Sequence, residues 1–579
     1  MAETLLSPGV LARETDQSFI QGQPIEAGAA VVGPAAKGPV GIPTLVSSYS
    51  EYEAIYGGAV TSGSQQYTYL TSISANNYFS QGGNSLLVTR VQSGSWSGAT
   101  STKMIAVSNS AANDNPFVLT TLSEGTIMNS TGSAGGGLGT NGILPSGSKD
   151  NLRWEINTVN TASGVFSLLI RRGDDNNNQK NVLETWNNLS LDPKASNYIS
   201  KVIGDTSYSV EQDGTDYYVK SSGNYVNKSN YVRVSAVNSP TSDYFDNNGV
   251  AKTAFGKQLP QTQSGAFESG SGNLFSPSAS LSPAKWYDEI SADNIQGISK
   301  TDYNESLDLL TNKDDYKFNL LTVPGLNNSD HGTQVSKAVT VAETRQDCIA
   351  VIDLDGYNTN VNTIVNGASG FDSSYAATYW PWLQTVTGGR TVWVPASTLI
   401  PGVYAFTDKS SDAWFAPAGL TRGALGNVTK AERKLTAGNR DTLYAANVNP
   451  IATFPGSGVV VFGQKTLQKR ASALDRVNVR RLLISLKSFI SQVADNLVFE
   501  QNSIATRNSF LTQVNPYLES VQQRQGLYAF KVVMDETNNT ADVVDRNELV
   551  GQIFLQPTKT AEFIVLDFNV LPTGATFPA

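Results

Sequence analysis

Cysteine and histidine are almost absent from this sequence, which has one of each in 579 residues. A single cysteine cannot form a disulfide within the chain, and one cysteine with one histidine cannot supply the ligands of a zinc site. We therefore expect a fold held together by packing and hydrogen bonds, without a metal or another cofactor. Cys348, in "DCIAVIDLD", is interpreted as a small buried core residue rather than a reactive thiol.

An excess of basic residues and a long apolar run are missing too. The chain has 41 Lys and Arg against 50 Asp and Glu, which gives a formal net charge of -9. Coating a nucleic acid or an anionic membrane requires a local excess of Lys and Arg, so we expect neither as a direct partner. No window approaches the roughly 20 apolar residues that span a bilayer, and the start "MAETLLSPGV" lacks the features of a secretory signal. We expect no stable membrane insertion and a protein that stays in the cytosol unless it is carried or released.

The length and the changes of composition predict several domains. Residues 23–91 read as strand, loop, strand and helix, followed by a further helix and a buried strand. Residues 92–284 are rich in Ser, Asn, Gly, Thr and Asp, with strand-like runs between polar turns, which predicts an inserted β-rich surface domain. The other predicted units are a central α/β domain (285–450), a C-terminal α+β domain (451–560) and two strand-like ends (1–22 and 561–579).

Helical and strand signals alternate in the central part. The apolar runs "KFNLLTVPG", "CIAVIDLDG" and "TVWVPAS" predict strands, and the helix between the first two places Val335, Ala338, Val339 and Ala342 on one stripe. Strands separated by helices indicate a mainly parallel sheet that is covered on both faces. The fold class is therefore α/β plus α+β, in several domains.

The C-terminal part begins with a strongly amphipathic helix in "VNVRRLLISLKSFISQVADNLVFEQN". Its apolar stripe consists of Leu482, Leu486, Phe489, Val493 and Leu497, opposed by a polar face of Arg481, Ser485, Ser488, Gln492 and Asp495. A second helix is predicted over about 507–524, and strands follow in "GLYAFKVVMDE", "LVGQIFLQP" and "AEFIVLDFNV". The basic "RVNVRR" at the start is interpreted as a solvated or ion-paired helix face.

Two segments resemble the catalytic motifs of subtilisin-type serine proteases. His331 lies in "DHGTQVSKAV" and Asp353 in "VIDLDG", but the aspartate of those enzymes precedes the histidine, and no GTS-type serine motif follows here. We interpret His331 as a helix-entry residue and expect no enzyme activity. The acidic run 173–181 lacks the spacing of an EF-hand and is read as a polar hairpin turn rather than a calcium site, and "GPAAKGPVG" lacks the ending of a phosphate-binding loop.

The C-terminal runs "DRVNVRRLLISLKSFISQVADNLVFEQN" and "GLYAFKVVMDETNNTADVVDRNELVGQIFLQPTKTAEFIV" resemble the tail sheath family of contractile phages and related injection machines. In that family, an NVRRL helix ending in a phenylalanine, an acid and an asparagine leads to a strand pair and a closing "aEF" strand. The opening "SPGVLARETDQS", the run "AAVVGPAAKGPVGIPTLVSSYSEYEAIYG" and the segment "LETWNNLSLDPKASNYISKVIGDTSY" are similar to the same family.

The resemblance implies a structural subunit that polymerises as stacked hexameric rings around an inner tail tube. Contraction would drive the tube through the host envelope during genome delivery. It further implies a central domain with subtilisin-like topology, and baseplate and tail terminator or neck proteins as partners. The location would be the virion, with assembly in the host cytoplasm. Arg507, Glu519 and Arg524 are then candidate tube-facing residues.

The two strand-like ends have no evident partner in their own chain. Such strands can pair with the sheet edge of another subunit, and the resemblance implies that these arms complete a sheet in a neighbour's C-terminal domain. The residues expected in this exchange are Val10, Leu11, Phe19, Phe563, Ile564, Leu566, Phe568 and Val570. The alternative is an ordinary strand within the chain.

Three other functions stay open at this point. A sheath of a bacterial phage-like injection device has the same sequence features as a phage sheath. A serine hydrolase of subtilisin-like fold would act through His331, and a surface adhesin would display the Asn- and Ser-rich insertion as a monomer.

Overall fold

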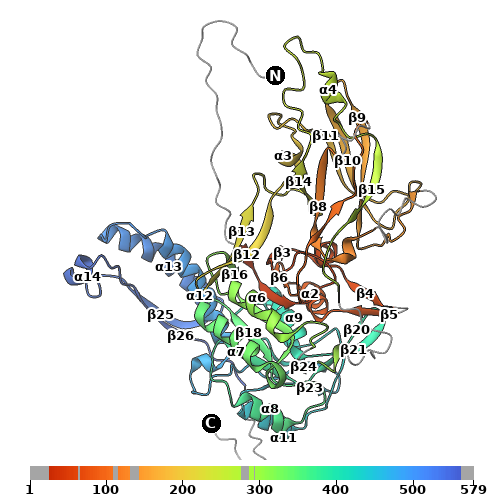
Figure 1. Cartoon of the computed structure of the whole chain (residues 1–579). Helices are drawn as coiled ribbons and strands as arrows, with labels where there is room; N and C mark the ends of the chain where they lie inside the picture. The colour runs from red at the N-terminus through yellow and green to blue at the C-terminus, as the bar shows by residue number, and fades with distance from the viewer. Residues whose placement is uncertain are drawn as a thin grey trace, which may run out of the picture.

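The structure is a computed structural model, and it describes residues 25–62, 65–108, 115–130, 142–274, 286–292 and 294–562. Figure 1 shows an α/β body, a β-rich body above it, and a group of C-terminal helices and strands that projects to one side. A mixed α/β architecture in several units is therefore confirmed.

An eight-stranded, mainly parallel sheet forms the centre of the α/β body. Only the two outermost pairs, β24 with β23 and β3 with β6, are antiparallel. In sheet order the strands are β24 Gly458–Val461, β23 Asn449–Phe454, β19 Ala376–Trp380, β18 Ile349–Asp353, β17 Leu320–Asn327, β2 Ala29–Gly33, β6 Leu86–Arg90 and β3 Thr44–Val46. The sheet thus joins the N-terminal region with segments more than 200 residues further along the chain.

Helices cover both faces of this sheet, as predicted. Along β2, Val31 belongs to one hydrophobic core and its neighbour Val32 to the other, because successive side chains point to opposite faces. The helices on the Val31 side are α1 Tyr49–Tyr56, α2 Leu70–Ser80 and α9 Ile400–Ser410. Those on the Val32 side are α6 Tyr303–Leu309, α7 Asn328–Arg345, α8 Val361–Ala368 and α11 Ala437–Ala445. The whole predicted stripe of α7 is buried in the second core.

One predicted strand belongs to a different sheet. The run "TVWVPAS" does contain a strand, but this β21 (Arg390–Val394) forms a small antiparallel sheet with β20 (Leu383–Thr387) and β22 (Val428–Ala431). Its burial alternates along the chain, which suits a half-exposed antiparallel strand. The strand beside β18 is β19 instead, whose "AATYW" is too short and too mixed to stand out in the sequence.

The insertion is β-rich, as predicted, and has its own hydrophobic core. Its sheet has the order β11 Val182–Ser190, β10 Val165–Arg172, β9 Leu152–Asn160, β15 Gln263–Glu268, β7 Gly98–Ser101, β8 Phe117–Glu124 and β14 Val232–Val237. Two short helices, α3 Ile199–Ile203 and α4 Thr253–Gly256, lie in the same body. Residues 173–181 connect the antiparallel pair β10 and β11, which confirms the predicted hairpin turn.

The insertion contacts the α/β body beside the neck where the chain enters and leaves it, and again through a separate hairpin. At the neck, the amide of Ser97 donates to the carbonyl of Ser271 at 3.1 Å. Beside it, Glu124 accepts from Arg90 Nη1 at 3.1 Å with its carbonyl and from the amide of Val40 at 3.3 Å with its carboxylate. The separate hairpin β12 (Ser207–Asp213) and β13 (Asp216–Ser222) packs Val210, Tyr217 and Val219 against the core on the α7 side of the sheet.

The C-terminal unit consists of two long helices and a β-hairpin. Its elements are α12 Val477–Asp495, α13 Ile504–Gln523, β25 Leu527–Val533, α14 Ala541–Asp545 and β26 Gln552–Pro557. In the predicted stripe, Leu482, Leu486 and Val493 are buried, and Phe489 and Leu497 pack against the same core. Two pairs of short strands lie outside these units: β1 Ile25–Ala27 pairs with β16 Tyr316–Phe318, and β4 Ala59–Ser62 pairs with β5 Gln65–Thr68.

Candidate assembly surface

The hairpin of β25 and β26 is a sheet of only two strands. The strands pair antiparallel, with Phe530 opposite Leu555 and Lys531 opposite Phe554. Within the described part of the chain, no third strand pairs with either outer edge. A two-stranded sheet is marginally stable in water on its own, and its open edges offer backbone N–H and C=O groups to a further strand.

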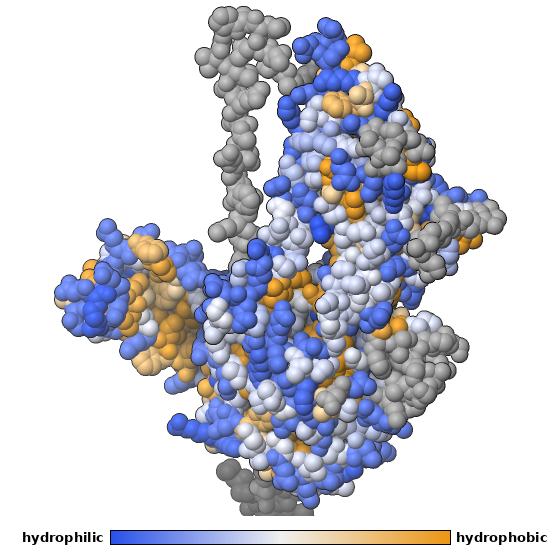
Figure 2. Space-filling model, viewed as in Figure 1, coloured by the Kyte–Doolittle hydropathy of each residue, from blue (hydrophilic) through white to orange (hydrophobic). Residues whose placement is uncertain are grey.

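The two faces of this hairpin differ in exposure. Phe530, Val532, Ile553 and Leu555 pack against the core between α12 and α13. Tyr528 on β25 is 66% exposed and Phe554 on β26 is 56% exposed. Figure 2 shows hydrophobic surface on the projecting C-terminal unit. The hairpin therefore combines unpaired strand edges with exposed aromatic side chains.

The turn between α12 and α13 and the first residue of α13 add further exposed apolar side chains. Val498 is 61% exposed, Ile504 is 63% exposed, and Phe499 has a fully exposed side chain on a backbone with φ of 70°. A positive φ is unusual for a bulky residue. This Phe499 is the phenylalanine that ends the NVRRL helix in the sequence resemblance.

The three candidate tube-facing residues all lie on or directly after α13 but differ in exposure. Arg507 is buried and donates from Nε to Asn502 at 2.8 Å. Glu519 is exposed. Arg524 is paired with Asp412 at 2.8 Å. A contact of these residues with a tube stays a prediction, and Arg507 is the one whose side chain is turned inward.

The eight residues expected in strand exchange, which are Val10, Leu11, Phe19, Phe563, Ile564, Leu566, Phe568 and Val570, lie outside the described residues. The described chain ends at Glu562, whose carboxylate is bound by Arg476. The sequence reasoning did not find this ion pair, because its partners are far apart in the chain.

The basic start of α12 is ion-paired, as predicted, but it is not solvated. Arg481 is buried, pairs with Asp408 and lies 4.7 Å from the ring centre of Tyr404. Arg480 is also buried, and its guanidinium lies 4.0 Å from the ring centre of Tyr375. Arg481 is thus ion-paired, which is one of the two predicted alternatives, whereas Arg480 is buried against Tyr375 and donates to the Ser374 hydroxyl. The helix begins inside the junction with the α/β body, where aromatic faces replace water around the cations.

His331 lies in the first turn of α7 as a helix-entry residue and is fully buried. Its Nδ1 accepts from the amide of Asn327 at 3.0 Å, and its Nε2 lies 3.1 Å from the carbonyl oxygen of Ser291. Burial lowers the pKa of this imidazole, so it is neutral at pH 7 and Nε2 donates to Ser291. Both ring nitrogens are therefore engaged by backbone groups. The carboxylate of Asp353 accepts from the amide of Ser397 at 3.1 Å and from its hydroxyl, not from His331.

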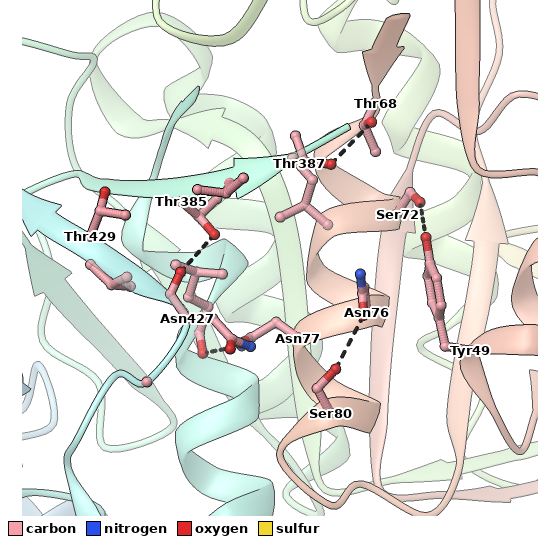
Figure 3. Close-up of a pocket in the computed structure, with 15 residues that line it drawn as sticks. Tyr49, Thr68, Ser72, Asn76, Asn77, Ser80, Thr385, Thr387, Asn427 and Thr429 are labelled. Carbon is pink, nitrogen blue, oxygen red and sulfur yellow. Dashed lines mark hydrogen bonds between the residues drawn. The ribbon is translucent and has the colours of Figure 1, made fainter. Parts of the chain in front are cut away.

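A hollow of about 440 Å³ lies between α2 and the antiparallel sheet of β20 to β22 (Figure 3). Amide and hydroxyl groups line it, and they bond to one another: Thr387 to Thr68, Thr385 to the carbonyl of Asn427, and Asn427 to Asn77. Its lining contains no carboxylate, imidazole, thiol or cationic side chain. The hydroxyl groups that line this hollow therefore have no carboxylate or imidazole in the lining to act as a general base.

The described ranges contain neither a candidate metal site nor a helix that could span a membrane. Nowhere in those ranges do three His, Cys, Asp or Glu side chains gather in a way that would hold a metal ion. No helix among the described residues is both long and apolar enough to cross a bilayer.

Comparisons with known proteins agree with the sequence resemblance. The family model of the phage tail sheath protein central domain matches residues 296–467, and that of the phage tail sheath C-terminal domain matches residues 470–570. The tail sheath protein of Vibrio phage KVP40 is 32% identical over 58% of this chain and 51% of its own length. That of Enterobacteria phage T4 is 34% identical over 41% of this chain and 39% of its own. The matched part thus spans about half or less of these relatives.

A solved structure shares the fold. The crystal structure of a sheath tail protein from Listeria innocua aligns with a TM-score of 0.51 at 11% identity, over 92% of this chain and 95% of that one. At this identity the likeness concerns the fold alone.

Proposed function

Since this chain carries the central and the C-terminal domain of phage tail sheath proteins, we propose that it is a structural subunit of a contractile tail sheath. In this role it polymerises as stacked hexameric rings around an inner tube and contracts to drive the tube through the host envelope. The observation that carries the proposal is the pair of adjacent domain matches, which together run from residue 296 to residue 570. The role is structural and needs no enzyme activity.

The subunits are joined by exchanged strands in this proposal. The open edges of the hairpin of β25 and β26 support it, because an added strand would satisfy their backbone groups. Each added backbone hydrogen bond contributes about 1 kcal/mol net, and each buried apolar side chain of the arm about 1.5 to 3 kcal/mol. Val10, Leu11 and Phe19 act in one arm, and Phe563, Ile564, Leu566, Phe568 and Val570 in the other.

Contraction is a rearrangement of rigid bodies in this scheme. Two cores on the two faces of one sheet make the α/β body stiff, so it rotates and repacks as a unit while the arms stay paired. The extended sheath is metastable, and new contacts between subunits supply the work. We also propose a subtilisin-like topology for the central domain.

The other partners follow from the same role. They are the inner tail tube, the baseplate and the tail terminator or neck proteins, and the location is the virion after assembly in the host cytoplasm. Glu519 and Arg524 are the exposed candidates for contact with the tube.

Electron microscopy of two purified chains tests the proposal. The full-length protein should form long striated tubes in negative stain, and a chain without residues 1–20 and 563–579 should remain monomeric. This truncation keeps Glu562 and every element of the C-terminal unit. Compact monomers from the full-length chain would refute the sheath function, and tubes from the truncated chain would refute assembly by arm exchange.

A further inference from the structure

Four hydrogen bonds converge on the last described residue. The Glu562 carboxylate accepts from Arg476 Nε at 2.7 Å and Nη2 at 3.0 Å, from the Tyr444 hydroxyl at 2.8 Å and from Gln464 Nε2 at 3.1 Å. Gln464 Nε2 also donates to the Thr560 hydroxyl at 2.6 Å. We call these five residues the Glu562 clamp.

The clamp connects parts of the chain that are distant in sequence. Tyr444 lies in α11 of the α/β body, Gln464 follows β24, and Arg476 caps the N-terminus of α12. Thr560 and Glu562 come after β26, the last strand of the hairpin. The chain therefore leaves the hairpin and is bound again to the α/β body before residue 563 begins.

The clamp is shielded from solvent, which strengthens it. The Glu562 side chain is 17% exposed and that of Arg476 is 25% exposed. Burial alone would raise the pKa of Glu562, but the hydrogen bonds from Arg476, Tyr444 and Gln464 outweigh it and hold the pKa below the ordinary value. A bidentate arginine–carboxylate pair that accepts further hydrogen bonds is among the strongest polar contacts in proteins.

We propose that the Glu562 clamp anchors the root of the C-terminal arm, so that tension on the arm passes directly into α11 and the start of α12. This inference rests on the proposed function, which makes the arm a tether between subunits. Without the clamp, the same tension would reach the body through β26 and would peel it from β25, in a sheet of two strands. Glu562 is thus a positioning residue: it fixes where and in which direction the arm leaves the body.

A spin label at position 561 measures the anchoring in the full-length chain at a concentration too low for tubes to form. Ala561 is exposed, and the native Cys348 is buried and will not react, so Ala561→Cys takes a single label. Slow label motion is expected in this parent, and at least threefold faster motion after Glu562→Gln. Glu548→Gln is the control, because Glu548 pairs with Arg546 at 3.1 Å on the surface, away from the clamp. If the label moved no faster in the Glu562→Gln chain than in the parent, the proposal that Glu562 anchors the root of the arm would be refuted.

The rate at which assembled tubes break under shear tests whether tension on the arm passes through the clamp. Tubes of Glu562→Gln should break at least threefold faster under a fixed shear than those of the wild type and of Glu548→Gln. The charge-swapped pair Arg476→Glu with Glu562→Arg should regain part of the strength and of the label immobility, which separates loss of the contact from loss of folding. If Glu562→Gln tubes kept full strength although the label at position 561 was mobile, the claim that tension on the arm passes through the Glu562 clamp would be refuted. Absence of tubes from the wild type would instead refute the proposed function, and the label would still decide whether the clamp holds.

Discussion

Asp353 is a buried carboxylic acid at the end of β18. It is 4% exposed, and its polar partners are the amide and the hydroxyl of Ser397. Desolvation raises the pKa of Asp353 to about 7, although the two bonds from Ser397 oppose the shift. In the unfolded chain the ordinary pKa of about 3.9 applies. Between these values the folded protein binds a proton that the unfolded chain releases.

The free energy of unfolding should therefore fall as the pH rises from about 4 to 7, because the folded state must give up that proton. Asp353→Asn keeps the shape without a charge: its amide oxygen can accept from the Ser397 amide, and its NH2 group can donate to the Ser397 hydroxyl oxygen. We expect the difference in stability between this variant and the wild type to shift in favour of the variant by about 2 to 3 kcal/mol from pH 5 to pH 8. Urea unfolding followed by tryptophan fluorescence at both pH values measures this.

Asp314→Asn is the matched control, since Asp314 is exposed and should change the stability by less than about 0.5 kcal/mol at either pH. If Asp353→Asn gained no stability relative to the wild type from pH 5 to pH 8, the interpretation that the ionised, buried Asp353 carboxylate lowers the stability would be contradicted.

The hairpin between β10 and β11 depends on one aspartate. The Asp175 carboxylate accepts from Arg171 Nε at 2.7 Å, from Arg153 Nη1 at 3.3 Å and from the amide of Asn181 at 2.9 Å. The side chains of Arg153 and Arg171 are fully buried. The turn that the sequence presents as merely polar is therefore fixed to the sheet by a buried network of charges.

Asp175→Asn should destabilise this sheet by about 3 to 5 kcal/mol, because it leaves two buried guanidinium groups with too little negative charge. Hydrogen exchange of the β10 and β11 amides in the full-length chain measures the loss. Asp174→Asn removes only the surface pair with Arg172 and should cost less than about 1 kcal/mol. Equal exchange in the two variants would show that the buried network contributes no more than the surface pair.

Elements with a strong local pattern could be predicted from the sequence. The stripe of α7 and that of α12 follow from their spacing alone, and the mainly parallel sheet follows from the alternation of helices and strands. The sheet to which β21 belongs could not be predicted, because an apolar run indicates a strand and not its neighbours. Contacts between residues far apart in the chain could not be predicted either, because a local pattern does not show which distant residue lies opposite. Arg481 is buried beside Asp408, and the Glu562 clamp joins Tyr444, Arg476 and Glu562.

At the scale of the whole molecule, the insertion is attached by a narrow neck. Ser97 and Ser271 face each other as an antiparallel bridge. Replacing residues 98–270 by an Asn-Gly turn should therefore leave the α/β body folded, since such a turn joins two antiparallel strands directly. The lost contacts of Val210, Tyr217 and Val219, together with the bonds of Glu124 to the buried Arg90 and to Val40, should lower the free energy of unfolding by at least about 2 to 4 kcal/mol.

Urea unfolding and electron microscopy of the shortened chain test this independence. It should unfold cooperatively and still form tubes under the proposed function, because the hairpin of β25 and β26 lies outside the removed part. An aggregated or unfolded chain would show that the insertion is required for the folding of the body.

The central sheet also dictates an order of events during synthesis. β2 and β6 are made first and pair with each other, but the other neighbour of β2 is β17, which begins at Leu320. At roughly 5 to 20 residues per second, a ribosome needs about 10 to 50 s to travel from Arg90 to Leu320. During that interval the insertion can fold from its own contiguous residues, while the open edge of β2 waits for β17. The central sheet is complete only after β24 has been made, late in synthesis. Until then apolar surface of the α/β body is exposed, and this is the stage at which a chaperone would be needed most to prevent aggregation.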